Sequence, residues 1–379
     1  MGLDAANFHR QHFEKANRIP IIESARMASA PLISRRNFIS QIALAAKRSK
    51  RNLIDAHHHL IPSFYVEDDE YRELVNRANN GKVHPAYSSR WTPEKDLQAM
   101  DESGVETAIL SLSTPSVWLG KGKAAKAAAM ARRVNEYMAE IRRLYPGRFG
   151  SFAIPPFPDV DRSLLEIAYA LDVLKADGIV LMSSYEGKHL GDPGYEPILK
   201  VLNDRKAVVF VHPTPPPCCR DVQPLLRPVM FEVPDDTTRA IGELLFSGTL
   251  EKFPEIRFIF AHAGGTVPMM IPRMRQYAPD NWREKAPKGI EYYLRRLYYD
   301  IAGTAYPPAI AALMGLVAPT QILFGSDHPF LPIADTAEGM AILRFSRRGR
   351  ELISRGNALR LMPELATRMK SSAILSPSA

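Results

Sequence analysis

The sequence predicts a (β/α)8 barrel, or TIM barrel, over residues 52–379. Eight runs that read as strands each precede a run that reads as a helix. Most strand runs are rich in Val, Ile and Phe throughout, which is typical of a parallel sheet with both faces buried. The chain has 379 residues, and such a barrel needs about 250. An open doubly wound sheet is the alternative. That fold typically has a glycine-rich phosphate loop after its first strand, where this chain has three histidines.

Each expected element follows from its local pattern. The helix after Thr92, for example, has that residue as its N-cap, Pro93 at its first position and Glu94 in its first turn. The expected strands are Asn52–His57, Val105–Leu112, Phe149–Ile154, Gly178–Met182, Ala207–Val211, Arg257–Ala261, Leu297–Ile301 and Ile322–Gly325. The expected helices are Pro93–Ser103, Lys121–Leu144, Arg162–Lys175, Tyr195–Arg205, Thr237–Ser247, Val267–Tyr277, Pro308–Leu316, Asp335–Phe345 and Asn357–Leu365. Right-handed crossovers between successive parallel strands favour a barrel.

The positive charge of the chain is concentrated before the first strand. Residues 1–52 hold ten Lys or Arg and three acidic residues, a balance of +7 out of the total of +8. We therefore treat residues 1–51 as a basic N-terminal extension. Within it, the segment from Ser34 through Arg35, Arg36 and Phe38 resembles a twin-arginine export signal, but it runs into further basic residues instead of a small-residue cleavage site. A cytoplasmic location is expected, with export through this signal as the alternative.

Charge and hydropathy exclude two classes of partner. With about +1 left for residues 53–379, the barrel has no excess of positive charge with which to bind a nucleic-acid backbone. No stretch approaches the roughly 20 apolar residues that a membrane-spanning helix needs. The expected partner is instead a small molecule.

Histidines and one aspartate follow four of the expected strands. They occur in Asp55-Ala-His57-His58-His59, Val211-His212-Pro213, Ala261-His262-Ala263 and Ser326-Asp327-His328-Pro329. Residues i and i+2 of a strand share a face, so the first and third histidines of the triplet point the same way and the middle one points elsewhere. Active sites of such barrels collect at the carboxyl ends of the strands. We predict a site for one divalent metal with the ligands His57, His59, His212 and Asp327.

The remaining histidines receive different roles. His262 follows the strand next to that of His212, and we predict it to be a catalytic general acid or base beside the metal. His58 and His328 flank predicted ligands but face away, so we expect them to be structural. No role is assigned to two histidines that lie in loops, His84 and His189.

Loop residues supply candidates for the substrate pocket. Arg90 lies in the long segment between the first strand and the first helix, where an arginine can bind a carboxylate through two hydrogen bonds; a solvated loop arginine is equally compatible with the spacing. Gly264 and Gly265 would permit close approach of substrate. Aromatic candidates for the pocket wall are Phe64, Trp91, Trp118 and Phe330.

Taken together, these motifs resemble the amidohydrolase superfamily. The resemblance is carried by the histidine triplet, His212, Phe260-Ala-His262-Ala-Gly264-Gly265, Gly325-Ser326-Asp327-His328-Pro329, the helix from Trp91 to Gly104 and the terminal segment from Gly356 to Pro363. More narrowly, the chain resembles the metal-dependent decarboxylase branch, which includes the aminocarboxymuconate-semialdehyde, resorcylate, carboxyvanillate and 6-methylsalicylate decarboxylases.

The resemblance implies one metal ion held by the four predicted ligands, with His262 as the catalytic histidine. In the reaction that we predict, Asp327 or His262 delivers a proton to the substrate. The resemblance also implies that an arginine in the region of Arg90 contacts the substrate carboxylate. Members of the branch are often dimers, so a homodimer is possible. Binuclear members use a carboxylated lysine on the fourth strand, and this chain has no lysine between Lys175 and Lys188. Zinc is slightly preferred for a nitrogen-rich ligand set, and manganese is the alternative.

The predicted function is non-oxidative decarboxylation of a small aromatic acid of the salicylate type, or of a related unsaturated acid. The metal is expected to bind the phenolic oxygen while the ring carbon that carries the carboxylate is protonated. A single-metal hydrolase that opens a lactone or cleaves an amide would use the same ligands and is the alternative. A barrel that holds a metal only for stability is the non-enzymatic alternative, which the open coordination position beside His262 disfavours.

Overall fold

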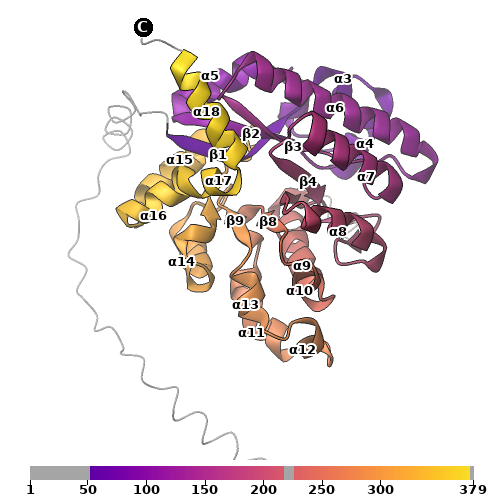
Figure 1. Cartoon of the computed structure of the whole chain (residues 1–379), viewed down its shortest axis with the longest axis vertical. Coiled ribbons are helices and arrows are strands. Elements are labelled where there is room, and N and C mark those ends of the chain that lie inside the picture. The colour runs from indigo at the N-terminus through magenta and orange to yellow at the C-terminus, as the bar shows by residue number, and fades with distance from the viewer. Residues whose placement is uncertain (1–51, 217–225, 376–379) are drawn as a thin grey trace, which may run out of the picture. The chain divides into compact units, whose positions relative to one another are not determined.

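The computed structural model describes residues 52–216 and 226–375, which form the barrel of Figure 1. Its eight strands pair in the order β1-β2-β3-β4-β7-β8-β9-β10, and every pair is parallel. The strands are β1 Leu53–Leu60, β2 Val105–Leu112, β3 Phe149–Ala153, β4 Gly178–Met182, β7 Val208–His212, β8 Arg257–Phe260, β9 Tyr298–Asp300 and β10 Ile322–Leu323. The predicted barrel is confirmed.

The first and last strands meet and close the barrel. The backbone N–H of Ala56 donates to the carbonyl of Phe324 at 3.0 Å, and His59 N–H donates to the carbonyl of His328 at 2.7 Å. A parallel bridge joins His58 to His328. Several strands differ in length from the prediction, most of all at the site: β1 runs on through the histidine triplet to Leu60, and β10 has only two residues. The longer β1 places all three histidines in extended backbone.

The helices lie around the strands in Figure 1. They are α3 Ser63–Val66, α4 Asp69–Ala78, α5 Pro93–Ser103, α6 Ala124–Leu144, α7 Val160–Ala168, α8 Glu196–Asp204, α9 Glu232–Phe246, α10 Thr249–Lys252, α11 Val267–Gln276, α12 Trp282–Lys285, α13 Ile290–Leu294, α14 Pro307–Leu316, α15 Ile333–Ile342, α16 Arg347–Glu351, α17 Asn357–Leu361 and α18 Pro363–Leu375. A small hairpin follows β4 and consists of β5 Ser184–Tyr185 and β6 Lys188–His189.

Local signals explain where α5 begins and ends. The Thr92 hydroxyl accepts the backbone N–H of Lys95, and Gly104 ends the helix with a φ of 77°, a conformation that favours glycine. By contrast, α9 begins at Glu232, five residues before the predicted start at Thr237. Pro234 lies in its first turn, where the missing N–H costs no helical hydrogen bond. The prolines of this region therefore do not all belong to the loop.

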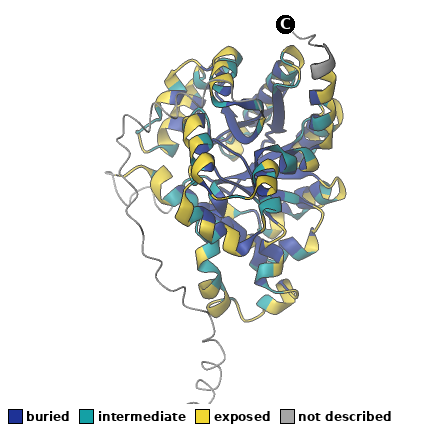
Figure 2. Ribbon diagram, turned by 90° about the vertical axis from the view of Figure 1, so that its left-hand side faces the viewer, coloured by how far each residue is buried: buried dark blue, intermediate teal, exposed yellow. Residues whose placement is uncertain are grey.

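The core lies inside the barrel and between the strands and the helices. Figure 2 shows buried strands surrounded by helices whose outer faces are exposed. Within the barrel, the rings of Phe152 and Phe210 pack 5.6 Å apart, and Phe210 also packs 4.9 Å from the ring of His57. The strand residues are almost entirely buried, as the Val, Ile and Phe content predicted. These packed side chains fill the barrel beneath the carboxyl ends of the strands.

The contacts within the chain separate residues 1–49 from residues 50–379. The twin-arginine-like segment lies outside the described residues. In the part of the chain that the structure describes, we find no helix with the length and apolar character needed to cross a membrane.

Candidate metal centre and active site

The four predicted ligands come together at the carboxyl ends of the strands. His57 and His59 lie on one face of β1, as strand alternation requires, with their ring centroids 4.9 Å apart. His212, the last residue of β7, has its ring 4.8 Å from that of His59. Asp327 follows β10, and its Oδ1 lies 3.3 Å and 3.2 Å from Nε2 of His57 and His59. Ligand atoms of all four residues lie within 4.8 Å of one another.

Hydrogen bonds fix the tautomer of all three histidines. Nδ1 of His57 lies 2.9 Å from Oδ2 of Asp300, that of His59 lies 3.1 Å from the carbonyl of Ser111, and that of His212 lies 2.8 Å from the carbonyl of Pro213. These oxygens only accept, so each Nδ1 carries the proton. In a neutral ring, Nε2 is then a bare lone pair.

The Nε2 lone pairs of the three histidines converge beside the carboxylate of Asp327. Nε2 of His57 and Nε2 of His59 lie 3.0 Å apart, and the buried Oδ1 of Asp327 accepts no hydrogen bond from the described residues. Lone pairs and a carboxylate at this separation repel each other unless a proton or a metal cation lies between them. Three nitrogens and one carboxylate oxygen are also ligands that zinc and manganese accept. The site therefore fits one divalent cation.

The charges around the site favour a positive charge there, which either a proton on His57 or a metal cation supplies. Burial lowers the pKa of His57, but the charges of Asp300 and Asp327 outweigh it and raise the pKa to about 10. Burial and the neighbouring imidazoles hold the pKa of His212 well below its usual value, which favours the neutral form that a metal requires. Burial raises the pKa of Asp327, but the charge of His57 and bonds to the histidines lower it well below its ordinary value. The site thus presents a carboxylate and strong negative potential to a cation.

His262 lies beside the four ligands, as predicted. Its Nε2 is 3.3 Å from Oδ2 of Asp327, and its ring centroid is 5.1 Å from that of His57. Nδ1 of His262 is buried without a hydrogen-bond partner among the described residues. The backbone of His262 determines where the ring lies. It has a φ of 55°, and its N–H donates to Oδ1 of Asp300 at 3.1 Å. An imidazole next to the carboxylate ligand is placed to give or take a proton.

The two glycines after His262 serve packing rather than substrate approach. A Cβ on Gly264 would lie 2.6 Å from the ring of Tyr299, and a Cβ on Gly265 would lie 2.2 Å from the carbonyl of Pro234 in α9. The space beside both glycines is filled by protein. They let the loop after β8 pack tightly enough to bring His262 to the site.

Sequence reasoning missed Asp300, whose carboxylate bonds both the ring of His57 and the backbone of His262. This fully buried carboxylate ends β9. Oδ2 orients His57, while Oδ1 accepts the backbone N–H groups of His262 and Ala302. A carboxylate that holds the far nitrogen of a ligand histidine fixes the ring and increases its basicity. Its position at a strand end was the available signal, but nothing local distinguishes it from an ordinary loop aspartate.

The two histidines predicted to be structural lie apart from the four predicted ligands. His58 is fully buried on the outward face of β1, with Nε2 3.0 Å from Oδ2 of Asp96 on α5. The ring of His328 packs 4.9 Å from that of His58. His189, which received no role, bonds Oδ1 of Asp236 at 3.0 Å in a separate network.

His84 lies closer to the site than its sequence context suggested. Its ring is 5.4 Å from Phe330, which in turn packs 5.5 Å from His59. Burial and the charge of Arg227 lower the pKa of His84, while the charge of Asp327 opposes them. Phe330 thus packs between His84 and the predicted ligand His59, and its role in a pocket wall stays a prediction. The other predicted wall residues Phe64 and Trp91 pack against Tyr137 instead.

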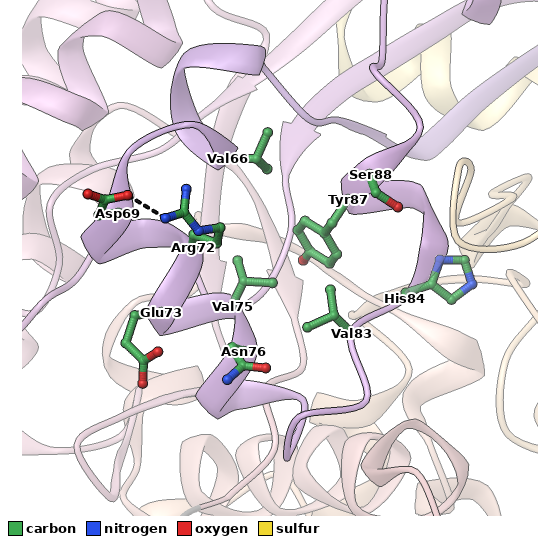
Figure 3. Close-up of a pocket in the computed structure, with 10 residues that line it drawn as sticks. All are labelled: Val66, Asp69, Arg72, Glu73, Val75, Asn76, Val83, His84, Tyr87 and Ser88. Carbon is green, nitrogen blue, oxygen red and sulfur yellow. Dashed lines mark hydrogen bonds and ion pairs between the residues drawn. The ribbon is translucent and has the colours of Figure 1, made fainter.

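A cavity of about 560 Å³ lies between α4 and the 3-10 turn η1 (Pro85–Ser88). Figure 3 shows Val75, Val83 and Tyr87 at its centre, with the ion pair of Asp69 and Arg72 at one side. Tyr87 packs 5.4 Å from Phe330, and burial together with the charge of Asp327 raises the pKa of its hydroxyl. These aromatic rings lie between the cavity and the predicted ligand His59.

A second cavity, of about 250 Å³, lies at the ends of β2, β4 and β7. Met182 connects it to the proposed metal site, because Met182 is the register partner of His212 and paired residues of a parallel sheet face the same side. Trp118, Leu119 and Pro215 supply apolar lining. The indole N–H of Trp118 donates to Glu186 at 2.9 Å.

Arg90 is exposed and has a φ of 50°. Its backbone carbonyl accepts a hydrogen bond from Nζ of Lys95 at 2.8 Å. Its guanidinium forms no ion pair with Asp327 or with another carboxylate of the described residues. The structure therefore does not bring Arg90 into the cluster of the other predicted residues.

Comparison with known proteins identifies the family. The amidohydrolase family profile matches residues 54–363. The chain belongs to the amidohydrolase family. A 6-methylsalicylic acid decarboxylase from Penicillium expansum is 36% identical over 327 residues, covering 82% of this chain and 96% of the relative. Decarboxylase macB from Penicillium terrestre is 33% identical over 328 residues, covering 82% of this chain and 95% of the relative.

Solved structures agree on the fold. A dihydroxybenzoic acid decarboxylase from Polaromonas sp. JS666, crystallised with bound manganese and the inhibitor 2-nitroresorcinol, matches with a TM-score of 0.72 at 23% identity, covering 83% of this chain and 97% of that chain. The family match and the named relatives confirm the predicted resemblance and the predicted enzyme class, a carboxy-lyase of the amidohydrolase family. They favour decarboxylation over the hydrolase alternative.

Proposed function

We propose that this amidohydrolase removes the carboxylate of an ortho-hydroxybenzoate of the salicylate type as CO₂, without an oxidant. The observation that carries the proposal is the convergence of three histidine Nε2 atoms and Oδ1 of Asp327, an oxygen with no hydrogen-bond partner among the described residues, with His262 beside them. The substrate class is supported by the relative named 6-methylsalicylic acid decarboxylase.

His57, His59, His212 and Asp327 would hold one divalent cation. The nitrogen-rich donors favour zinc, and manganese is the alternative, supported by the manganese in the Polaromonas enzyme. When bound, the cation supplies positive charge that stabilises negative charge developing on substrate oxygens.

The side chains of this chain would supply binding and the proton. In the proposed reaction, His262 or Asp327 gives a proton to the ring carbon that bears the carboxylate. The bond between that carbon and the carboxyl group then breaks, its electron pair returns to the ring, and CO₂ leaves. Arg90 would bind the carboxylate of the incoming acid, after its loop side chain turns toward the barrel mouth.

The cavity at the ends of β2, β4 and β7 offers a place for the aromatic ring. Its volume of about 250 Å³ exceeds the roughly 150 Å³ of an apolar cavity that binds benzene. Met182 and Trp118 line it, and apolar walls of this kind suit a ring that carries a small substituent.

The proposed reaction predicts the products of a direct assay. Metal-loaded protein incubated with salicylate, 6-methylsalicylate and 2,6-dihydroxybenzoate is expected to release one CO₂ per phenol formed. In D₂O, the phenol should carry one deuterium at the former carboxyl position, because the proton comes from an exchangeable group. Elemental analysis of the same sample should give one zinc or manganese per chain. Hydrolysis of a lactone or an anilide, with no CO₂ from any acid of the panel, would refute the proposal in favour of the hydrolase.

Replacing Arg90 by Gln tests its proposed contact with the substrate. We expect KM to rise about 10- to 100-fold with little change in kcat, since a hydrogen bond to a charged group contributes about 1.5–3 kcal/mol. Arg72→Gln is a matched control, because Arg72 lies in the same segment between β1 and α5 and pairs with Asp69 at the surface. An unchanged KM in Arg90→Gln would show that another group binds the carboxylate.

We also propose a homodimer and a cytoplasmic location, with export through the twin-arginine-like segment as the alternative. Val229, Met230 and Phe231 are each more than half exposed, and contiguous apolar side chains of this kind are typical of protein interfaces. Light scattering of the purified protein tests the homodimer. Fractionation of the source cells tests the location.

A further inference from the structure

A second group of buried polar side chains lies on the outward face of β1, behind the proposed metal site. His58 points there because the histidines on either side of it point inward. Its ring packs against that of His328, with an interplanar angle of 33°. Asp96 reaches the group from α5 and is 1% exposed. We call this group the back cluster, and its members are Asp55, His58, Asp96, Ser326 and His328.

Asp55 ties β1 to the segment that follows β10. Its Oδ1 accepts the backbone N–H of His57 at 3.1 Å and that of Ser326 at 2.9 Å. Its Oδ2 accepts the hydroxyl of Ser326 and bonds Nδ1 of His58 at 2.9 Å. One fully buried carboxylate therefore joins two segments that are more than 260 residues apart.

Asp96 ties helix α5 to the same two segments. Its Oδ2 bonds Nε2 of His58 at 3.0 Å, and its Oδ1 lies 3.2 Å from Nε2 of His328. The backbone N–H of His328 also donates to the hydroxyl of Ser326 at 3.1 Å. Both residues that flank Asp327 are thus held by the back cluster.

Asp327 itself needs such support. Its φ of 65° lies in the left-handed region, which residues other than glycine keep only when their surroundings impose it. Its backbone N–H donates to the carbonyl of His57 at 2.8 Å. The position of its carboxylate among the histidines therefore depends on the backbone of the segment that the back cluster holds.

We propose that Asp55, His58 and Asp96 are positioning residues that hold the Asp327 carboxylate in place for metal binding. Asp55 fixes Ser326, Asp96 fixes His328, and His58 connects the two carboxylates. The middle histidine of the triplet thereby supports a ligand contributed by the opposite end of the chain. The inference rests on the proposed metal site and does not depend on which reaction the site performs.

A second metal ion is the competing interpretation of this cluster. His58, Asp96 and His328 each offer a ligand atom within 4.8 Å of the others. Structural zinc sites, however, take four protein ligands, and the described residues supply three here. Both ring nitrogens of His58 already have a carboxylate partner. The hydrogen bonds account for the cluster without a metal.

Titration of the metal-free full-length protein with Mn²⁺ and Zn²⁺, followed by calorimetry, tests the inference without an activity assay. Asp96→Asn is expected to raise the metal Kd about 10- to 100-fold, the usual effect of losing a residue that supports a ligand. Ser326→Ala, which removes a hydroxyl and leaves both carboxylates, should raise the Kd in the same direction by a smaller factor. Excess metal should restore occupancy in both variants.

Asp101→Asn is the matched control, because Asp101 lies on the same helix and pairs with Arg148 near the surface. A wild-type metal Kd in folded Asp96→Asn or Ser326→Ala would overturn the inference, even if the melting temperature falls. Binding of two metal ions per wild-type chain, with loss of one in His328→Gln, would also overturn it. A wild-type chain that binds neither metal would refute the proposed metal site, a result distinct from unchanged affinity in the variants.

Discussion

Replacing His262 by Asn is expected to lower kcat about 10³-fold, within the range that general acid–base catalysis contributes, while the protein still binds one metal ion. Nε2 of His262 lies 3.3 Å from Oδ2 of Asp327, so the imidazole adjoins the site without being one of the four converging ligands. Asparagine keeps a polar side chain of smaller reach but cannot transfer a proton near neutral pH. The measurement pairs steady-state kinetics on the best acid of the panel with metal analysis of the same sample.

The metal content decides how a loss of activity in His262→Asn is read. A variant that loses both metal and activity would make His262 a ligand or a support for the site. Near-normal kcat in a fully metallated variant would remove His262 from the mechanism and leave Asp327 as the proton donor. Deuterium uptake from D₂O in any residual product shows whether the same ring carbon is still protonated.

Replacing His59 by Ala is expected to abolish both metal binding and activity. The loss of metal affinity should exceed the roughly 10- to 100-fold that follows removal of a mere supporting residue, because a converging nitrogen is removed. His59 is fully buried, with Nδ1 held by the carbonyl of Ser111 and Nε2 3.2 Å from Asp327. Its removal therefore leaves a cavity and an unbalanced carboxylate. Calorimetric titration with Zn²⁺ and Mn²⁺, together with circular dichroism to establish folding, measures the effect.

His189→Gln provides the matched control for His59→Ala. Like His59, His189 is a histidine beside a carboxylate, Asp236, but it is only partly buried and lies in the hairpin after β4. Glutamine can still donate to that carboxylate, so we expect wild-type metal affinity and activity. Retention of a full metal equivalent and normal turnover in His59→Ala would contradict the proposed ligand set.

Strand β1 shows how far local pattern predicts the site. Alternation along a strand separates His57 and His59 from His58 whatever the rest of the fold does. Parallel strands that end at the same face then bring His212 and Asp327 toward them. Local pattern also predicted the limits of α5, because capping residues act within one turn. It placed the start of α9 five residues late, because a proline in a first helical turn looks the same as a proline in a loop.

Local sequence pattern could not predict hydrogen-bond partners that lie far apart in the chain. Asp300 and His57 are 243 residues apart, and Asp96 and His58 are 38 apart; no periodicity encodes either pairing. The glycines after His262 were predicted to face substrate, but they face Tyr299 and α9. Arg90 was predicted from its place in a loop, and a loop position does not specify where a long side chain points.

The sequence by itself determined the eight-fold alternation of strand and helix and the set of candidate metal ligands at the strand ends. Both follow from periodicity and from the chemistry of residue types, which act over a few residues. Only the tertiary structure decided the tautomers of the histidines, the support behind Asp327 and the cavities beside the site. These depend on hydrogen bonds and packing between segments that meet only when the barrel closes.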